Sequence, residues 1–540
     1  MKYKIILFFI FILAIILRFY GNNWDQGQHL HPDERFLTMV ATDITLPKSV
    51  NEYFDTNTSP ANPYNYQQYQ FFVYGIFPVL FTKTISSLLS MDTYGQLNLI
   101  GRYLSGLVDA LCVLVIYKIL EIYNKKKIGL LASLLYACTV LPIQLSHFYA
   151  VDTYLSFTLL LSFFFLTKNK YIPAGIFFGI ALACKISALY FLPVVAVFYI
   201  INICKNKKID FISPILFLIF SGIFLRIFQP YLFIDLWKLN PQFLENINTL
   251  KSFSDPSGWF PPSVQWVSKT PVLYPIQNII FWGAGLGLTI LSIFSIRSKN
   301  KNILFFTSSF WIIFLVIIQG KEFAHTLRYF LPIYPFLCIL ASIGFFTLKT
   351  KLKYILLTSH LLYSLAFLTI YSVPHSRYQA SSWIYENISQ DKVLSYEYWD
   401  DPLPLNIEGQ LNTYASVQLA PYDLPDKENK LEKSKDANYI IFSSNRLWGS
   451  IPLVPEKYPY TSIWYKDIFQ KKSFKKFVSY PGFKLPIGKC VYIGPTNYPS
   501  SNSWYEVDPT CNYPGIYLRD DTSEEAFTVY DHPQVLIYAN

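Results

Sequence analysis

Long apolar stretches recur along the first 371 residues, and they constrain the fold more than any other feature of the sequence. Each stretch is near the roughly 20 residues that an α-helix needs to cross a bilayer. With 52% hydrophobic and only 15% charged residues, the chain has too many such runs for one soluble core. The sequence therefore predicts a polytopic α-helical membrane protein. We expect eleven spans, at residues 5–20, 101–123, 128–145, 153–167, 171–186, 188–203, 211–228, 277–296, 303–319, 329–348 and 353–371.

The formal net charge of +10 follows from membrane topology. A charge of this sign can indicate a nucleic-acid partner, but here the cations cluster in short loops between apolar stretches, as the positive-inside rule requires. If the N-terminus is cytoplasmic, all these clusters are cytoplasmic: 125–127, 168–170, 205–208, 297–301 and 349–353. The first stretch lacks a small-residue cleavage site, so we interpret it as a retained span. We therefore expect this chain to contact membrane lipid and not to bind nucleic acid.

The stretch 71–89 decides the topology, because counting it as a span would move every later basic cluster to the outside. Pro78 and Lys83 within it favour a helix that lies at the outer interface instead. On this model the inner face has only short basic loops, so we expect the chemistry outside. The outer face then carries the loops 21–100, 146–152, 229–276 and 320–328, and the chain from residue 372 onward.

Residues 372–540 differ in character from the rest of the chain. Apolar runs shrink to strand length at 392–396 and 438–443, and 381–387 is expected to be a short helix. We therefore predict two domains, a membrane domain of residues 1–371 and an extracytoplasmic soluble α/β domain of residues 372–540.

Two of the seven cysteines, Cys490 and Cys511, fall in the polar C-terminal region. If that region is extracytoplasmic, they can form a disulfide, although one pair of cysteines does not decide this. The chain has no Cys-x-x-Cys pair, which disfavours zinc. Whether the protein uses another divalent metal stays open.

Acidic residues gather in the predicted outer loops. Asp33 and Glu34 follow Pro32 in the first loop, and Asp152 follows the Ser146-His147-Phe148 run in the second. Two acids in the first turn after a proline are also what helix capping favours, and Asp152 could be an N-cap. Successive helical side chains point about 100° apart, so Asp33 and Glu34 cannot face one spot. One of them would act as a base, and the other would orient it or the acceptor.

The predicted outer side also carries cations and histidines that could contact a substrate. Arg226 and Arg328 end and begin spans on the leaflet where cations are not favoured by topology, which adds weight to a ligand role. Lys185 could contact a phosphate or extend to the interface, and Arg102 opens the second span. The histidines considered as polar contacts or as interface residues are His31, His147 and His325, whose spacing resembles no metal motif.

The chain resembles the GT-C superfamily, specifically the family 39-like, protein O-mannosyltransferase-related enzymes that use polyprenyl-phosphate sugars. The resemblance rests on the Asp33-Glu34 pair, on the runs 101–105 and 146–153, on Lys185 after a Gly-Ile-Ala-Leu-Ala run, and on 328–335. It implies that Asp33 is the catalytic base and that Asp152 assists nearby. The C-terminal region resembles a bacterial subgroup of this family, which implies a location in the bacterial inner membrane.

The sequence and this resemblance thus predict an inverting glycosyltransferase that acts on the outer face of the membrane. Asp33 would take the proton of an acceptor hydroxyl as it attacks the sugar of a polyprenyl-phosphate donor. Cations at the bilayer edge would stabilise the leaving phosphate, and the candidates are Arg226, Arg328, Lys185 and Arg102. The acceptor could be a glycan, a lipid or a protein. A transporter or flippase for a lipid-linked glycan, and a non-catalytic glycan-binding assembly protein, are the alternatives.

Overall fold

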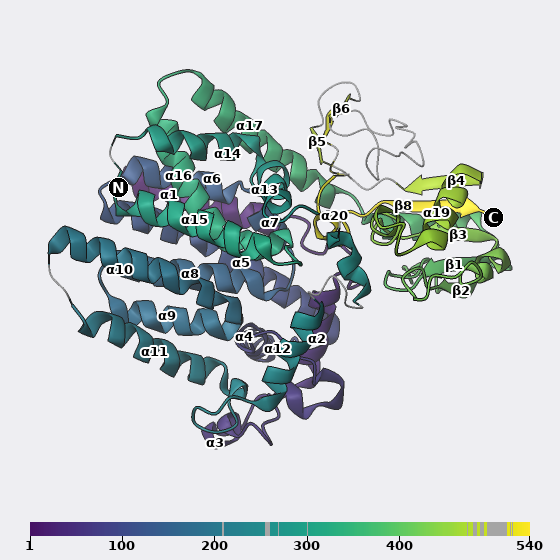
Figure 1. The fold of residues 1–540 in the computed structure, drawn as a ribbon, viewed down its shortest axis with the longest axis horizontal. Helices are drawn as coiled ribbons and strands as arrows, with labels where there is room; N and C mark the ends of the chain where they lie inside the picture. The colour runs from purple at the N-terminus through teal and green to yellow at the C-terminus, as the bar shows by residue number, and fades with distance from the viewer. Residues whose placement is uncertain are drawn as a thin grey trace.

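The computed structural model shows a bundle of helices at one end of the molecule and a smaller sheet-containing part at the other (Figure 1). It describes residues 1–207, 210–253, 260–267, 269–299, 301–471, 473–478, 483–485, 491–493, 516–518, 520 and 522–540. The N-terminus lies in the bundle, and the C-terminus lies at the far edge of the sheet-containing part (Figure 1). The predicted combination of a helical membrane region with a C-terminal α/β region is confirmed.

The long apolar stretches form the helices of the bundle. Each of the eleven predicted spans falls on one of these helices or on a pair of them. They are α1 (Lys2–Phe19), α5 (Tyr94–Ile122), α6 (Lys126–Ala137), α7 (Val140–Ser146), α8 (Val151–Thr167), α9 (Tyr171–Cys184), α10 (Leu192–Asn206), α11 (Ile212–Phe228), α13 (Leu273–Asn278), α14 (Gly285–Phe294), α15 (Ile303–Lys321), α16 (Tyr334–Thr347) and α17 (Leu352–Leu368).

Length and composition separate these helices into groups. Among the described residues, five helices are long and apolar enough to cross a membrane, or seven if each of two bent pairs counts as one span. The bent pairs are α6 with α7, at 55°, and α13 with α14, at 112°. Three further apolar helices, α8, α9 and α11, are shorter. Helix α1 is apolar except for Lys2, Lys4 and Arg18.

Close helix contacts inside the bundle depend on small residues and on one buried ion pair. A Cβ atom added at Gly175 or Gly179 of α9 would lie 2.3 or 2.4 Å from a backbone oxygen of α11, so these glycines let the two helices touch. Arg18 donates to the Asp109 carboxylate at 2.6 Å, and both side chains are fully buried. This pair joins α1 to α5.

Shorter helices lie outside the bundle core, namely α2 (Pro32–Asp43), α3 (Val50–Phe54), α4 (Phe77–Leu88) and α12 (Pro241–Phe253). Helix α4 covers most of the stretch 71–89, but residues 71–76 are not helical. Its 12 residues are too few to cross a bilayer, which needs about 20. The N–H of Gly75, just before α4, donates to the Cys184 carbonyl oxygen at the end of α9.

The C-terminal part contains two sheets. The first has the strand order β2-β1-β3-β8-β4, in which β1 pairs in parallel with β2 and β3, and β8 is antiparallel to β3 and β4. Its strands are β1 (Val393–Glu397), β2 (Ala415–Leu419), β3 (Tyr439–Phe442), β4 (Ser473–Val478) and β8 (Val535–Ala539). The second, three-stranded sheet consists of β5 (Phe483–Leu485), β6 (Val491–Ile493) and β7 (Ile516–Leu518).

Helices α18 (Ser376–Asn387), α19 (Pro459–Lys471) and α20 (Glu525–Thr528) complete this part. The two predicted strands correspond to β1 and β3. The predicted helix 381–387 is longer than expected, because α18 starts at Ser376, where the His375 side chain caps it by accepting the Arg377 N–H. Cys490 and Cys511 lie outside the described residues.

Candidate active site

The first turn of α2 carries the Asp-Glu pair that the sequence singled out. Pro32 occupies the first helical position, and the His31 side chain caps the helix by accepting the Glu34 N–H at 3.3 Å. The capping function therefore belongs to His31, and both carboxylates are free for other partners. As the helical periodicity predicts, Asp33 and Glu34 point to different neighbours.

Glu34 is fully buried and holds α2 against α5. Its carboxylate accepts the Arg102 guanidinium and the Asn98 amide of α5, and also the Tyr149 N–H at 2.9 Å. Arg102 in turn donates to both Asp25 oxygens, at 3.0 and 2.8 Å. Glu34, Arg102 and Asp25 are all fully buried. Since breaking a buried ion pair typically costs 3–5 kcal/mol, this arrangement fixes α2 in place.

Asp33 forms an ion pair with Arg328 from the 3-10 helix η8 (Leu327–Ile333). Both side chains remain about a quarter exposed. Burial would raise the pKa of Asp33, but the Arg328 guanidinium and His31 outweigh it and hold that pKa well below its usual value. Asp33 is therefore ionised over the whole physiological pH range.

Asp152 and Lys185 form a second ion pair beside the first. Lys185, at the end of α9, donates to Asp152 in the first turn of α8 at 2.9 Å. The N-cap of α8 is Ala150, so Asp152 is not the cap. The Lys185 ammonium lies 4.4 Å from the centre of the Tyr329 ring, and the Arg328 guanidinium lies 5.6 Å from the same ring. Tyr329 thus lies near both cations.

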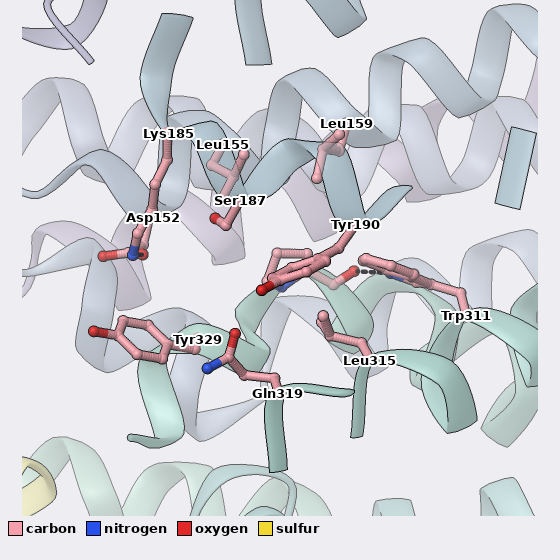
Figure 2. A pocket seen from close by; sticks show the side chains of 11 residues that line it. Asp152, Leu155, Leu159, Lys185, Ser187, Tyr190, Trp311, Leu315, Gln319 and Tyr329 are labelled. Atoms are coloured by element: carbon pink, nitrogen blue, oxygen red, sulfur yellow. Dashed lines mark hydrogen bonds and ion pairs between the residues drawn. The ribbon is translucent and has the colours of Figure 1, made fainter. Parts of the chain in front are cut away.

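A cavity of about 140 Å³ opens at the second ion pair (Figure 2). Its polar end carries Asp152, Lys185 and Tyr329, and Gln319 points into it from α15 (Figure 2). The other walls are mostly apolar. They are formed by Leu155, Leu159, Ser187, Tyr190, Trp311, Leu315 and Pro332. Such a cavity suits a ligand with an anionic head and an apolar tail.

The three histidines considered as polar contacts have different surroundings. The His31 ring packs against the Tyr530 ring with 4.0 Å between their centres, and burial lowers the pKa of His31 to about 4, so it is neutral near pH 7. His147 bonds two backbone oxygens, those of Ile143 and Tyr20. The Nδ1 atom of His325 bonds the Glu322 carbonyl oxygen. Among the residues that the structure describes, no cluster of three or more His, Cys, Asp or Glu could hold a metal ion.

Arg226, the remaining predicted cation, does not line this cavity. Its guanidinium lies over the rings of Phe54 and Phe233 and donates to the carbonyl oxygens of Leu236 and Pro230. The structure therefore brings Arg328 and Lys185 together near Asp33 and Asp152, while Arg102 contacts Glu34 and Asp25 inside the protein.

The sequence did not identify several residues of this site. Tyr329 belongs to the run 328–335, but only the structure shows that its ring lies near both cations. Glu524 and Tyr530 line a small second cavity with His31 and Arg328. They are about 200 residues from Arg328 in sequence, and no local pattern could have placed them there.

Comparisons with known proteins show what this chain is similar to. Residues 79–234 match the family model of dolichyl-phosphate-mannose-protein mannosyltransferases. The apo oligosaccharyltransferase of Archaeoglobus fulgidus has a similar structure, with a TM-score of 0.51 and 11% identity, covering 88% of this chain and 73% of that one. ArnT from Cupriavidus metallidurans bound to undecaprenyl phosphate has a TM-score of 0.47 and 12% identity, covering 71% of this chain and 65% of that one.

A comparison with curated protein sequences gave no significant match. The segment that matches the family model contains Arg102, Asp152, Lys185 and Arg226, whereas Asp33 and Arg328 lie outside it. The likeness to the oligosaccharyltransferase shows the fold. Together the two findings confirm the resemblance that the sequence indicated.

Proposed function

Because this chain has the GT-C membrane fold and matches the mannosyltransferase family over residues 79–234, we propose that it is a glycosyltransferase. It transfers a sugar from a polyprenyl-phosphate donor to an acceptor hydroxyl on the outer face of the membrane. Two ion pairs, Asp33 with Arg328 and Asp152 with Lys185, carry this proposal. Their two cations both lie near the Tyr329 ring, which lines a mostly apolar cavity.

The cavity suits the lipid-linked donor. The phosphate binds at its polar end to Lys185 and to Arg328, whose guanidinium lies near the lining residue Tyr329. The first isoprene units lie along Leu155, Leu159 and Leu315. A lipid tail held in this way partitions into the bilayer, so the enzyme needs no nucleotide-binding domain. A guanidinium can hold a phosphate by two hydrogen bonds at once, which a lysine cannot do.

Donor binding also changes the two carboxylates. In the structure each phosphate-binding cation forms an ion pair with an acid. When the phosphate takes over Arg328 and Lys185, Asp33 and Asp152 lose their counter-ions. The pKa of Asp33 then rises from its depressed value, which makes it a stronger base once the donor is in place. Donor binding thus precedes base activation.

In the transfer step, Asp33 accepts the proton of the acceptor hydroxyl while the hydroxyl oxygen bonds to the anomeric carbon of the sugar. The bond between that carbon and the phosphate oxygen breaks, and polyprenyl phosphate leaves with the bonding electrons. Attack from the side opposite the phosphate inverts the anomeric configuration. Arg328 and Lys185 stabilise the charge that develops on the leaving phosphate. Asp152 orients Lys185.

The test uses purified protein in lipid with a panel of polyprenyl-phosphate sugars, read out by release of polyprenyl phosphate. We expect Asp33→Asn to abolish release while polyprenyl phosphate still binds, and binds several-fold more tightly, because Arg328 has lost its competing carboxylate. The matched control is Asp426→Asn, which removes the carboxylate partner of another cation, Lys430, 2.7 Å away in the C-terminal part. It should leave both measurements unchanged.

Wild-type turnover in Asp33→Asn would contradict the proposed base. Movement of an intact lipid-linked glycan across the bilayer, without release of polyprenyl phosphate, would favour a transporter. Mass spectrometry of glycans, glycolipids and glycoproteins from a deletion strain would identify the acceptor.

A further inference from the structure

The segment 522–534, which we call the C-terminal strap, leaves the sheet-containing part and packs against the helix bundle. Phe527 belongs to the main hydrophobic core of the bundle. Gln144 of α7 donates to the Phe527 carbonyl oxygen at 2.7 Å, and the Tyr371 hydroxyl donates to Asp531 at 2.8 Å. The strap therefore has a fixed position relative to the bundle.

Glu524 of the strap contacts the chain immediately before Arg328. Its side chain is almost fully buried, and its carboxylate accepts the N–H of Leu327. Leu327 is the first residue of η8, so this N–H is one of the amides that a helix start leaves without an internal partner. The Glu524 N–H in turn donates to the Asn278 side chain at 2.8 Å. Asn278 thus fixes the backbone of Glu524, and the Glu524 carboxylate fixes the start of η8.

We propose that Glu524 is a positioning residue for the donor site: it fixes the start of η8 and thereby the direction in which the next residue, Arg328, presents its guanidinium. This inference rests on the proposed function. His31, Arg328, Glu524 and Tyr530 line one cavity of about 20 Å³, so the strap contributes side chains to the surroundings of Arg328.

The neighbouring Glu525 provides an internal comparison. It belongs to the same strap and is also mostly buried, but its carboxylate pairs with Arg446 of the C-terminal part at 2.6 Å. Loss of either carboxylate disturbs the strap, whereas only Glu524 contacts η8. Comparing variants of Glu524 with variants of Glu525 therefore distinguishes a positioning role from a contribution to folding.

The ionisation of Glu524 is consistent with this role. Burial raises the pKa of its carboxyl to about 7, while the Leu327 N–H and Arg328 oppose the shift. The charged and titratable groups around it are Arg328 in η8, His31 at the start of α2, Tyr334 in α16, and Glu525 and Tyr530 in the strap.

Two measurements on the full chain in lipid test the proposal: hydrogen exchange of the peptide containing Leu327, and binding of polyprenyl phosphate. We expect Glu524→Ala to speed exchange at Leu327 and to weaken binding about tenfold. Glu524→Gln keeps a carbonyl oxygen at the same place and should stay within about threefold of wild type. Glu525→Ala should leave binding unchanged even if it lowers the melting temperature equally.

If Glu524→Ala does not fold, Glu524→Asp serves instead, because its shorter side chain does not reach the Leu327 N–H. Unchanged exchange at Leu327 in these variants would overturn the proposal, and so would an equal loss of binding in Glu525→Ala. Absence of polyprenyl phosphate binding in the wild type would instead refute the proposed function, and the exchange measurement would still decide whether Glu524 holds η8.

Discussion

At the start of α2, three consecutive charged side chains have three different partners. Asp33 pairs with Arg328, Glu34 with Arg102, and Arg35 with Asp401 of the C-terminal part at 2.8 Å. The helix turns successive side chains about 100° apart, so one turn contacts three parts of the molecule. Of the three, only Asp33 is both partly exposed and next to the donor cavity, which is why we assign the base to it.

A comparison of two arginines tests the phosphate site. We expect Arg328→Lys to reduce kcat/KM for the donor roughly tenfold, about 1.4 kcal/mol, because a lysine keeps the charge but loses the two-point contact. Arg226→Lys should change it by less than about threefold, since Arg226 contacts aromatic rings and backbone oxygens away from the cavity. Steady-state kinetics with a polyprenyl-phosphate sugar measures both. An equal loss in the two variants would contradict the assignment of the phosphate contact to Arg328 alone.

The pH dependence of catalysis is expected to follow Glu524. Its pKa of about 7 means that the carboxylate is charged above pH 7 and neutral below, and a charged acceptor holds the Leu327 N–H more strongly. Donor kcat/KM should therefore rise between pH 6 and 8 in the wild type and stay flat in Glu524→Gln.

The contribution of Glu524 to the free energy of unfolding should show the opposite pH dependence. Because the folded-state pKa of Glu524 is raised from 4.5, the contribution of this group to folding is fully present below pH 4.5 and is lost as pH rises through about 7. Thermal melting of wild type and Glu524→Gln over this range would show it. A wild-type pH profile that persists in Glu524→Gln would contradict the assignment.

At the scale of elements, helix α4 determines how the chain threads the membrane. Its 12 residues are too short for a span, and it packs against α2 and α5. We therefore expect a reporter fused at residue 95, just after α4, to be extracytoplasmic, like one fused after residue 371. Reporter enzymes that are active on only one side of the membrane measure this. A cytoplasmic signal at residue 95 would reverse the orientation of every later helix.

At the scale of the whole molecule, the strap couples the C-terminal part to the bundle. Asp531 is nearly fully buried, and it accepts hydrogen bonds from Tyr371 and Gln144 and pairs with His532. Leaving these groups without their acceptor would cost several kcal/mol, because each is buried. The two parts should therefore behave as one unit in the wild type.

We expect Asp531→Ala to uncouple them, so that limited proteolysis releases a fragment of about the size of residues 372–540 much faster than from the wild type. Asp426→Ala, which removes an ion pair within the C-terminal part, is the control and should not speed release of this fragment. Equal cleavage rates in wild type and Asp531→Ala would show that the strap contributes little to the attachment.

The sequence by itself determined the membrane class, the positions of the helices and two of the strands. These follow from local properties: an apolar run of sufficient length has to satisfy its backbone as a helix in lipid, and strand-length runs between polar residues favour a sheet. It also indicated Arg328, because a charged residue at the end of a predicted span is costly and needs a partner, and the family resemblance added Asp33, Asp152 and Lys185.

Only the tertiary structure decided which charged side chains form ion pairs with one another. Arg102 and Arg328 look alike in sequence, yet one is enclosed between Glu34 and Asp25, and the other faces Asp33 beside a cavity. Glu524 reaches Leu327 across 197 residues. Such pairings depend on how helices pack in three dimensions, and a linear pattern of residue types carries no information about distances between segments that meet only after folding.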